Sequence, residues 1–175
     1  SDPLMSAAYM GTEGGFVVIS ADDPGPHSSQ TEQDSRMMAM MAKIPVLDPG
    51  SPRQAKQMIG LAFDLSEQFK TPVMLRPTTR VCHSRQDVEP GPLVAPQATP
   101  DFKKDPFRWA ATPKFRYQLH LALEEKLSRM AAFEPTAPRL MNPHAGGRRA
   151  IVSSGVASAY TAEVLRRLDL WDTFP

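Results

Sequence analysis

Three short apolar runs, separated by segments that can form helices, restrict the fold of this chain more than any other feature. The runs lie at residues 16–19, 44–47 and 73–76. The first is Phe-Val-Val-Ile, a mostly β-branched run typical of a strand that is buried on both faces. Parallel strands need crossover connections, which are usually helices. The alternation therefore predicts an α/β fold with a partial, doubly wound parallel sheet.

Helices are expected before and between these strands. Residues 1–10 open with Ser-Asp-Pro, a cap followed by proline in the first turn. Residues 52–69 follow the turn Asp-Pro-Gly-Ser-Pro and place apolar residues at helical spacing. Between them, residues 31–42 form a further predicted helix. Its methionines at 37, 38, 40 and 41 are interpreted as core or interface packing and not as a cofactor site.

The second half of the chain has a different character. Prolines interrupt residues 86–146 repeatedly, apart from one expected helix from about 114 to 133, so we interpret this part as an extended linker. Residues 149–155 and 157–168 then repeat the order strand, glycine turn, helix. The expected division is residues 1–85 as part of one α/β domain, 86–146 as the linker, and 147–175 as the first βα unit of a second α/β domain.

The composition restricts which partners this protein can bind and in which cellular compartment we expect it. Lys plus Arg number 20 and Asp plus Glu number 19, so no summed field would attract a nucleic acid or an anionic membrane. The single cysteine, Cys82, cannot form an internal disulfide, and no secretion signal or run of about 20 apolar residues is present. We therefore expect a cytoplasmic protein with no nucleic-acid and no membrane partner.

A polar loop follows the first expected strand. Residues 20–36 carry hydrogen-bond donors, acceptors and both signs of charge. Open α/β sheets bind ligands at the carboxyl ends of their strands. The loop is therefore a candidate pocket wall.

This loop also carries a family resemblance. The stretch VISADDPGPHSSQTEQDSR at 18–36, AKIPVL at 42–47, LR at 75–76 and TTRVCHSR at 78–85 closely resemble the large (alpha) subunit of indolepyruvate ferredoxin oxidoreductases. The resemblance extends over nearly the whole chain. It implies the second half of the domain that holds the aminopyrimidine of thiamine diphosphate, then a linker, then a transketolase-C-terminal-like domain.

The activity that the resemblance implies is oxidative decarboxylation of aryl 2-oxoacids to acyl-coenzyme A, with ferredoxin as electron acceptor. The complete enzyme would use thiamine diphosphate, Mg²⁺ and iron–sulfur clusters, and would be a homodimer or bind a partner subunit. The resemblance places the family's activating acid upstream of Ser1 and its magnesium motif downstream. One cysteine cannot supply the four thiolates of a cluster. We therefore expect an internal fragment that is inactive alone, with no catalytic residue, metal or cluster of its own.

The candidate site residues lie in the polar loop and after the third strand. The side chains of residues 27–30 are expected to contact substrate or cofactor, and Arg36 or Arg80 to pair with a substrate carboxylate through two hydrogen bonds. The loop residues are His27, Ser28, Ser29 and Gln30.

Two of these residues have an alternative, purely structural interpretation. His27 has the alternative of capping the helix expected near residue 31. Arg36 has the alternative of pairing with Glu32 one helical turn away, a surface contact of at most about half a kcal/mol.

Two other functions compete with the oxidoreductase. The first is a non-catalytic α/β assembly or binding module that docks a partner through its methionine-rich helix and incomplete sheet. The second is a small metal-dependent hydrolase in which acidic and imidazole side chains hold the ion. Its ligands would be Asp22, Asp23, His27 and His83.

Overall fold

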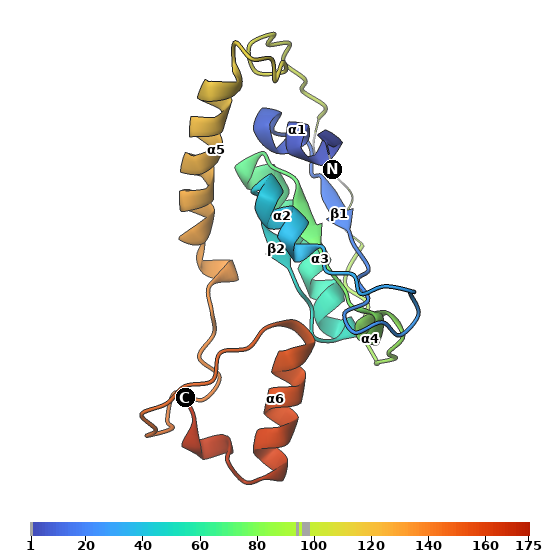
Figure 1. Ribbon diagram of the computed structural model, residues 1–175, viewed down its shortest axis with the longest axis vertical. Helices are drawn as coiled ribbons and strands as arrows, with labels where there is room; N and C mark the ends of the chain where they lie inside the picture. The colour runs from blue at the N-terminus through green and yellow to red at the C-terminus, as the bar shows by residue number, and fades with distance from the viewer. Residues whose placement is uncertain (1, 94, 96–98) are drawn as a thin grey trace.

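The computed structural model describes residues 2–93, 95 and 99–175, and its centre is a three-stranded parallel sheet (Figure 1). The strands are β1 (Val17–Ile19), β2 (Val46–Leu47) and β3 (Val73–Leu75), in the order β1-β3-β2. In register, Val18 lies opposite Met74. Leu47 lies opposite Leu75. The predicted α/β class and parallel sheet are confirmed.

Helices cover both faces of the sheet. On one face, α1 (Asp2–Met10) and α2 (Arg36–Ala42) pack around Met74 of the central strand. On the other, α3 (Pro52–Phe69) packs on the side chains of β3 that point the opposite way. This division follows from strand geometry, because successive side chains alternate between the faces. Ser1, where the first helix was predicted to begin, lies outside the described residues.

The strand buried on both faces is β3 and not β1. All three residues of β3 are buried, whereas Ile19 in β1 is 63% exposed. The prediction for the first apolar run was wrong because its own composition cannot tell a central strand from an edge strand. The topology decides this, since β3 inserts between the two strands that precede it.

Helix α3 forms where the sequence predicted it, between the same two residues. The Ser51 hydroxyl accepts a hydrogen bond from the Gln54 amide at 3.2 Å, and Pro52 occupies the first turn. The helix ends at Phe69 and is followed by the cap residue Lys70, whose φ of 52° is left-handed. Both ends are therefore set by local chemistry.

Helix α2 begins at Arg36, five residues later than expected, and its methionines face outward. Ala39 and Ala42 are the buried residues of this helix. The methionines are therefore not core residues, because the small alanines allow α2 to approach the sheet closely, and their packing at an interface stays a prediction. Four side chains are instead 40–64% exposed, namely Met37, Met38, Met40 and Met41.

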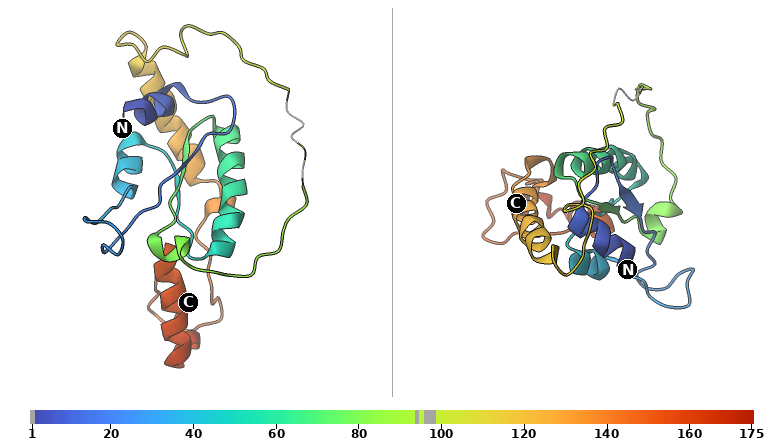
Figure 2. Two further views of the ribbon diagram at one scale, coloured as in Figure 1. Left: turned by 90° about the vertical axis from the view of Figure 1, so that its right-hand side faces the viewer. Right: turned by 90° about the horizontal axis from the view of Figure 1, so that it is seen from above.

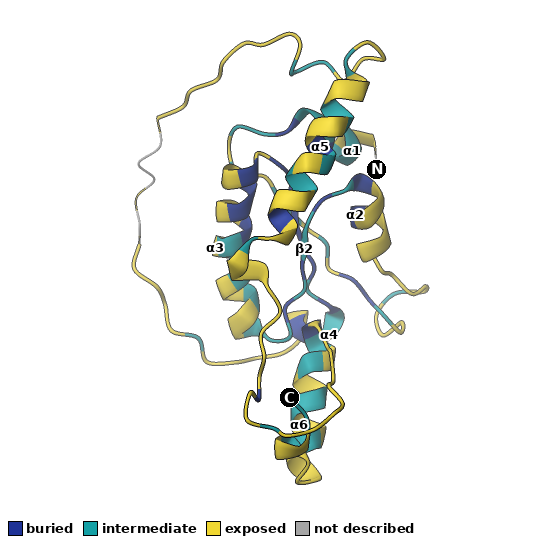
Figure 3. Ribbon diagram, turned by 90° about the vertical axis from the view of Figure 1, so that its left-hand side faces the viewer, coloured by how far each residue is buried: buried dark blue, intermediate teal, exposed yellow. Residues whose placement is uncertain are grey.

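The helix predicted at about 114–133 is confirmed as α5 (Arg116–Ala131), which docks on the first 85 residues (Figures 1 and 3). Its Met130 side chain joins the α3 cluster, where Phe133 meets Phe69 edge to face with ring centroids 5.4 Å apart. At the other end of α5, the Tyr9 hydroxyl and His120 Nδ1 are hydrogen-bonded at 2.9 Å. Helix α5 thus connects the helix layers of both faces, and a short 3-10 turn, η1 (Glu134–Thr136), follows it.

Between α4 (Thr79–Cys82) and α5, the described residues contain no helix or strand, and the described parts of this stretch swing away from the body in Figure 2. Its first part is held to α3, where the Arg53 amide donates to the Gln86 side chain at 2.9 Å. Near its end, Arg108 pairs with Glu13. The described part of this segment therefore has no regular structure, and its role as a linker stays a prediction.

The last segment contains α6 (Gly155–Arg167) and the 3-10 turn η2 (Trp171–Thr173), below the carboxyl ends of the strands in Figure 1. The strand predicted at 149–152 does not form, and Val152 is 94% exposed. A β-branched run needs a neighbouring strand for its backbone hydrogen bonds, and none lies beside it in the described residues. Across those same residues, no helix is both long and apolar enough to span a membrane.

Candidate functional site

The carboxyl ends of the three strands meet at a buried charge network. Arg76 directly follows the central strand, with Asp22 after β1 on one side and Asp48 after β2 on the other. The Arg76 Nε atom lies 2.6 Å from Asp22 Oδ2, and its Nη1 atom lies 3.3 Å from Asp48 Oδ2. The side chains of Arg76 and Asp22 are each only 3% exposed. This network fixes the relative positions of the three loops that follow the strands.

The two carboxylates of the network have opposite pKa shifts. Burial alone would raise the pKa of Asp22, but hydrogen bonds from Ser35 and Arg76 outweigh burial and hold it below its usual value. Burial raises the pKa of Asp48, and attraction to Arg76 offsets this only in part. The Oδ1 atom of Asp48 has no hydrogen-bond partner among the described residues, which agrees with that direction.

Asp23, the neighbour of Asp22, organises the polar loop. Its Oδ2 atom accepts hydrogen bonds from three successive backbone amides, those of residues 27, 28 and 29, each at 2.8 Å. Its Oδ1 atom accepts a hydrogen bond from the Thr79 hydroxyl at 2.7 Å. These donors, Thr79 first, hold the pKa of Asp23 well below its usual range, so the carboxylate stays ionised. The loop and α4 are thereby joined by one side chain.

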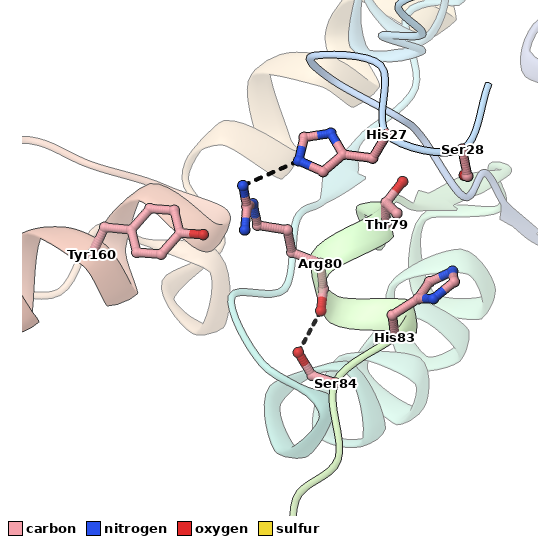
Figure 4. Close-up of a pocket in the computed structure, with 7 residues that line it drawn as sticks. All are labelled: His27, Ser28, Thr79, Arg80, His83, Ser84 and Tyr160. Atoms are coloured by element: carbon pink, nitrogen blue, oxygen red, sulfur yellow. Dashed lines mark hydrogen bonds between the residues drawn. The ribbon is translucent and has the colours of Figure 1, made fainter. Parts of the chain in front are cut away.

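An open pocket of about 450 Å³ lies beside this loop (Figure 4). Three segments form it: the polar loop, α4 with the two residues that follow it, and α6. Figure 4 shows Arg80 between His27 on one side and Tyr160 on the other. The described lining residues are His27, Ser28, Thr79, Arg80, His83, Ser84 and Tyr160.

Arg80 is the arginine that faces this pocket. Its Nη2 atom lies 3.1 Å from His27 Nε2, and its guanidinium carbon lies 5.9 Å from the centre of the Tyr160 ring. Arg36, the other candidate, does not line the pocket. Its guanidinium is held by Asp34 through two hydrogen bonds of 2.6 and 2.8 Å. The expected alternative contact from Arg36 to Glu32 was therefore wrong, because α2 begins only at Arg36 and the two residues do not share a helical turn.

The remaining candidate residues divide between the pocket and the loop. His27 does not cap a helix. Its Nδ1 contacts the Gly25 carbonyl, and its Nε2 accepts a hydrogen bond from Arg80. Ser28 lines the pocket, whereas Ser29 accepts a hydrogen bond from the Gln33 side chain at 3.1 Å. Gln30 is exposed and is not among the described lining residues.

The residues of the alternative hydrolase do not form a metal site. Asp22 and Asp23 are occupied by the donors described above, and His83 contributes only to the pocket lining. Among residues 2–93, 95 and 99–175, no group of three His, Cys, Asp or Glu side chains is placed to hold a metal ion.

Sequence reasoning missed Arg76 as the centre of the charge network and Tyr160 as part of the pocket. The sequence did contain a signal for Arg76, because this charged residue ends an otherwise apolar strand. The acidic residues Asp22 and Asp48 follow the other two strands, so an ion pair could have been predicted. No local signal marks Tyr160, because it reaches the pocket from a segment about 80 positions away in the chain, α6 against α4.

A three-stranded parallel sheet packed against helices, with a polar pocket at its carboxyl edge, defines an α/β protein. More specifically, the chain is homologous over about 97% of its length to a part of indolepyruvate oxidoreductase subunit IorA. This homology confirms the family resemblance.

Three relatives illustrate the match. The subunit IorA of Methanothermobacter thermautotrophicus is 39% identical over 172 residues, which cover 97% of this chain and 28% of the relative. That of Thermococcus kodakarensis is 39% identical over 178 residues, covering 98% and 28%. That of Archaeoglobus fulgidus is 37% identical over 171 residues, covering 97% and 27%. The chain thus spans little more than a quarter of the length of these relatives. No protein-family model and no solved structure matches it.

Proposed function

We propose that this chain is part of a cytoplasmic oxidoreductase that converts aryl 2-oxoacids such as indolepyruvate to acyl-coenzyme A, with ferredoxin as electron acceptor. The observation that supports this most is the 37–39% identity to indolepyruvate oxidoreductase subunit IorA over nearly the whole chain. In this proposal, residues 1–85 are half of a pyrimidine-binding domain, residues 86–146 a linker, and residues 147–175 the start of a transketolase-C-terminal-like domain. The chain alone is inactive, and the complete enzyme is a dimer or binds a partner subunit.

Thiamine diphosphate supplies the carbanion chemistry of such a reaction, and iron–sulfur clusters carry the electrons. The pocket residues fit one part of this chemistry better than the others. The described lining has a guanidinium, hydroxyls and imidazoles but no carboxylate. It therefore fits an anionic group of the substrate, and does not fit Mg²⁺ or the acid that activates the pyrimidine. We assign this pocket to the substrate.

Arg80 is assigned to the substrate carboxylate. Its side chain is exposed, and His27 and Tyr160 flank the guanidinium without neutralising its charge. A planar guanidinium offers two parallel donors to a carboxylate, which a lysine ammonium cannot reproduce. His27 orients Arg80 by accepting one of its hydrogens, while Ser28 and Thr79 place hydroxyls on the same wall.

The test uses the full-length protein together with any partner subunit it requires. Reduction of ferredoxin by indolepyruvate and coenzyme A is measured for the wild type, Arg80→Lys, Arg80→Ala and the control Arg85→Ala, which replaces an exposed arginine outside the described lining. Loss of a charge-assisted hydrogen bond predicts a KM for indolepyruvate raised about 10- to 100-fold in Arg80→Ala, and raised less in Arg80→Lys. An unchanged KM in both Arg80 variants removes Arg80 from the site. Absence of turnover in the wild type contradicts the proposed reaction.

The assembly module is the second candidate, and the exposed methionine surface of α2 favours it. Methionine side chains adapt to different partners, and the four on α2 lie on one short helix. Met40→Glu with Met41→Glu, examined by analytical ultracentrifugation of the full-length protein, tests this function. A complex that dissociates while the wild type shows no 2-oxoacid turnover supports the module. An active enzyme with unchanged sedimentation excludes it.

A further inference from the structure

We propose that Tyr160 is a specificity-determining residue, which selects an aromatic side chain for the substrate whose carboxylate pairs with Arg80. This inference rests on the proposed function and deepens it. It assigns a role in substrate recognition to α6, although the other described lining residues come from the polar loop and from α4 with the two residues after it.

Tyr160 is suited to this role by its exposure and its position. Its side chain is 51% exposed although it lines the pocket, so the ring retains free apolar surface. Apart from the imidazoles of His27 and His83, it is the aromatic residue of the described lining. A pocket of about 450 Å³ lies within the usual range of small-molecule sites and is large enough for a bicyclic aromatic acid.

The distance between the guanidinium and the ring allows one aryl 2-oxoacid to reach both groups. The Arg80 guanidinium carbon lies 5.9 Å from the centre of the Tyr160 ring. In an aryl 2-oxoacid, the carboxylate and the ring are separated by the keto carbon and one methylene. Such a ligand can therefore place its carboxylate on Arg80 while its ring packs against Tyr160, at the 4.5–7 Å separation of centroids that aromatic pairs prefer. A short aliphatic 2-oxoacid reaches Arg80 but leaves the Tyr160 ring in water.

The position of Tyr160 is fixed by the start of its helix. Gly155, the first residue of α6, packs so closely on the loop after β2 that a Cβ on Gly50 would lie 2.6 Å from the Gly155 carbonyl oxygen. From Gly155, the helix carries Tyr160 to the side of Arg80 that is opposite to His27 (Figure 4). A helix that is docked before the ligand arrives needs little ordering on binding, which favours selectivity.

The experiment compares Tyr160→Ala, Tyr160→Leu and Tyr160→Phe in the complete enzyme, with Tyr117→Ala as the control. Tyr117 is 70% exposed on α5 and does not line the pocket. The first readout is kcat/KM for indolepyruvate and for pyruvate. The second is calorimetric binding of indole-3-acetate, an unreactive aryl carboxylate, which needs no turnover.

We expect Tyr160→Ala and Tyr160→Leu to lower kcat/KM for indolepyruvate about tenfold, mainly through KM, and to weaken indole-3-acetate binding about as much. Pyruvate turnover should change less than about twofold, and Tyr160→Phe should match the wild type because it keeps the ring. An equal loss for both substrates, or unchanged binding of indole-3-acetate, overturns the assignment. If the wild type turns over no 2-oxoacid, the proposed function fails, while the binding measurement still decides the role of Tyr160.

Discussion

The backbone of Gly155 lies directly against the carboxyl group of Asp48. A Cβ added to Gly155 would lie 2.7 Å from Cγ and Oδ2 of Asp48, and the φ of Gly155 is +56°. Both the close approach and the left-handed backbone favour glycine at this position. The contact connects the first residue of α6 to the charge network around Arg76, and so connects the last segment of the chain to the sheet.

Gly155→Ala is therefore expected to displace α6 from the sheet. The left-handed backbone and the overlap with Asp48 together predict a loss of about 1–3 kcal/mol in the free energy that holds α6 in place. Hydrogen exchange of the α6 amides measures this as faster exchange confined to residues 155–167. Gly146→Ala is the matched control, because a Cβ there has no neighbour within 4 Å. Unchanged exchange in Gly155→Ala would show that α6 is held by other contacts.

Arg76→Met tests the charge network. The substitution leaves the buried Asp22 and the partly buried Asp48 without their cation, and removal of one partner from a buried ion pair costs about 3–5 kcal/mol. Urea denaturation of the full-length protein should show this loss, whereas Arg85→Met at an exposed site should leave stability within about 0.5 kcal/mol of the wild type. Adding Asp22→Asn to Arg76→Met should restore part of the loss. A double variant as unstable as the sum of the two single variants would contradict a coupled pair.

Acid should weaken the polar loop. The pKa values of Asp22 and Asp23 are lowered, and the hydrogen bonds from Arg36 lower the pKa of Asp34 to about 2. A carboxyl with a lowered folded pKa contributes stability above its unfolded pKa, 3.8 for aspartate, and this stability is lost as pH falls through the folded value. The free energy of unfolding should therefore fall as pH drops from about 4 towards 2. A flat profile over this range would contradict the hydrogen-bonding roles of these carboxylates.

Asp48 provides the internal check on that profile, because its pKa is raised. Its contribution to the free energy of unfolding is present below pH 3.8 and is lost as pH rises through the raised folded pKa. This pH dependence is opposite in sign to that of Asp22, Asp23 and Asp34. Asp48→Asn removes this opposing contribution. The variant should thus lose stability more steeply than the wild type between pH 5 and pH 2, as measured by urea denaturation at each pH.

The elements that sequence predicted well are those whose ends are set by neighbouring residues. Helix α3 is the clearest example, since Ser51, Pro52 and the end at Lys70 define it without reference to the rest of the chain. The parallel sheet also followed from local patterns. The run at 149–152 had the same composition as a strand but forms none, because strand pairing depends on a partner that composition does not reveal.

The location of the candidate pocket could be predicted from the sequence, but the full set of residues that line it could not. The carboxyl edge of the sheet and the residues His27, Ser28 and Arg80 followed from the order of elements and the family resemblance. Arg36 differed from Arg80 only through its partner Asp34, a contact that depends on where α2 begins. Tyr160 required the docking of α6, which is decided by a tertiary contact at Gly155.

Because Asp23 binds backbone amides of the polar loop, the path of this loop does not depend on which side chains it carries. Asp23 binds backbone amides at positions 27, 28 and 29, and every amino acid except proline offers that same amide. Substitutions at these three positions can accumulate without altering the course of the loop. At positions 27 and 28, which line the pocket, the side chain can therefore change while the backbone amide that binds Asp23 stays the same.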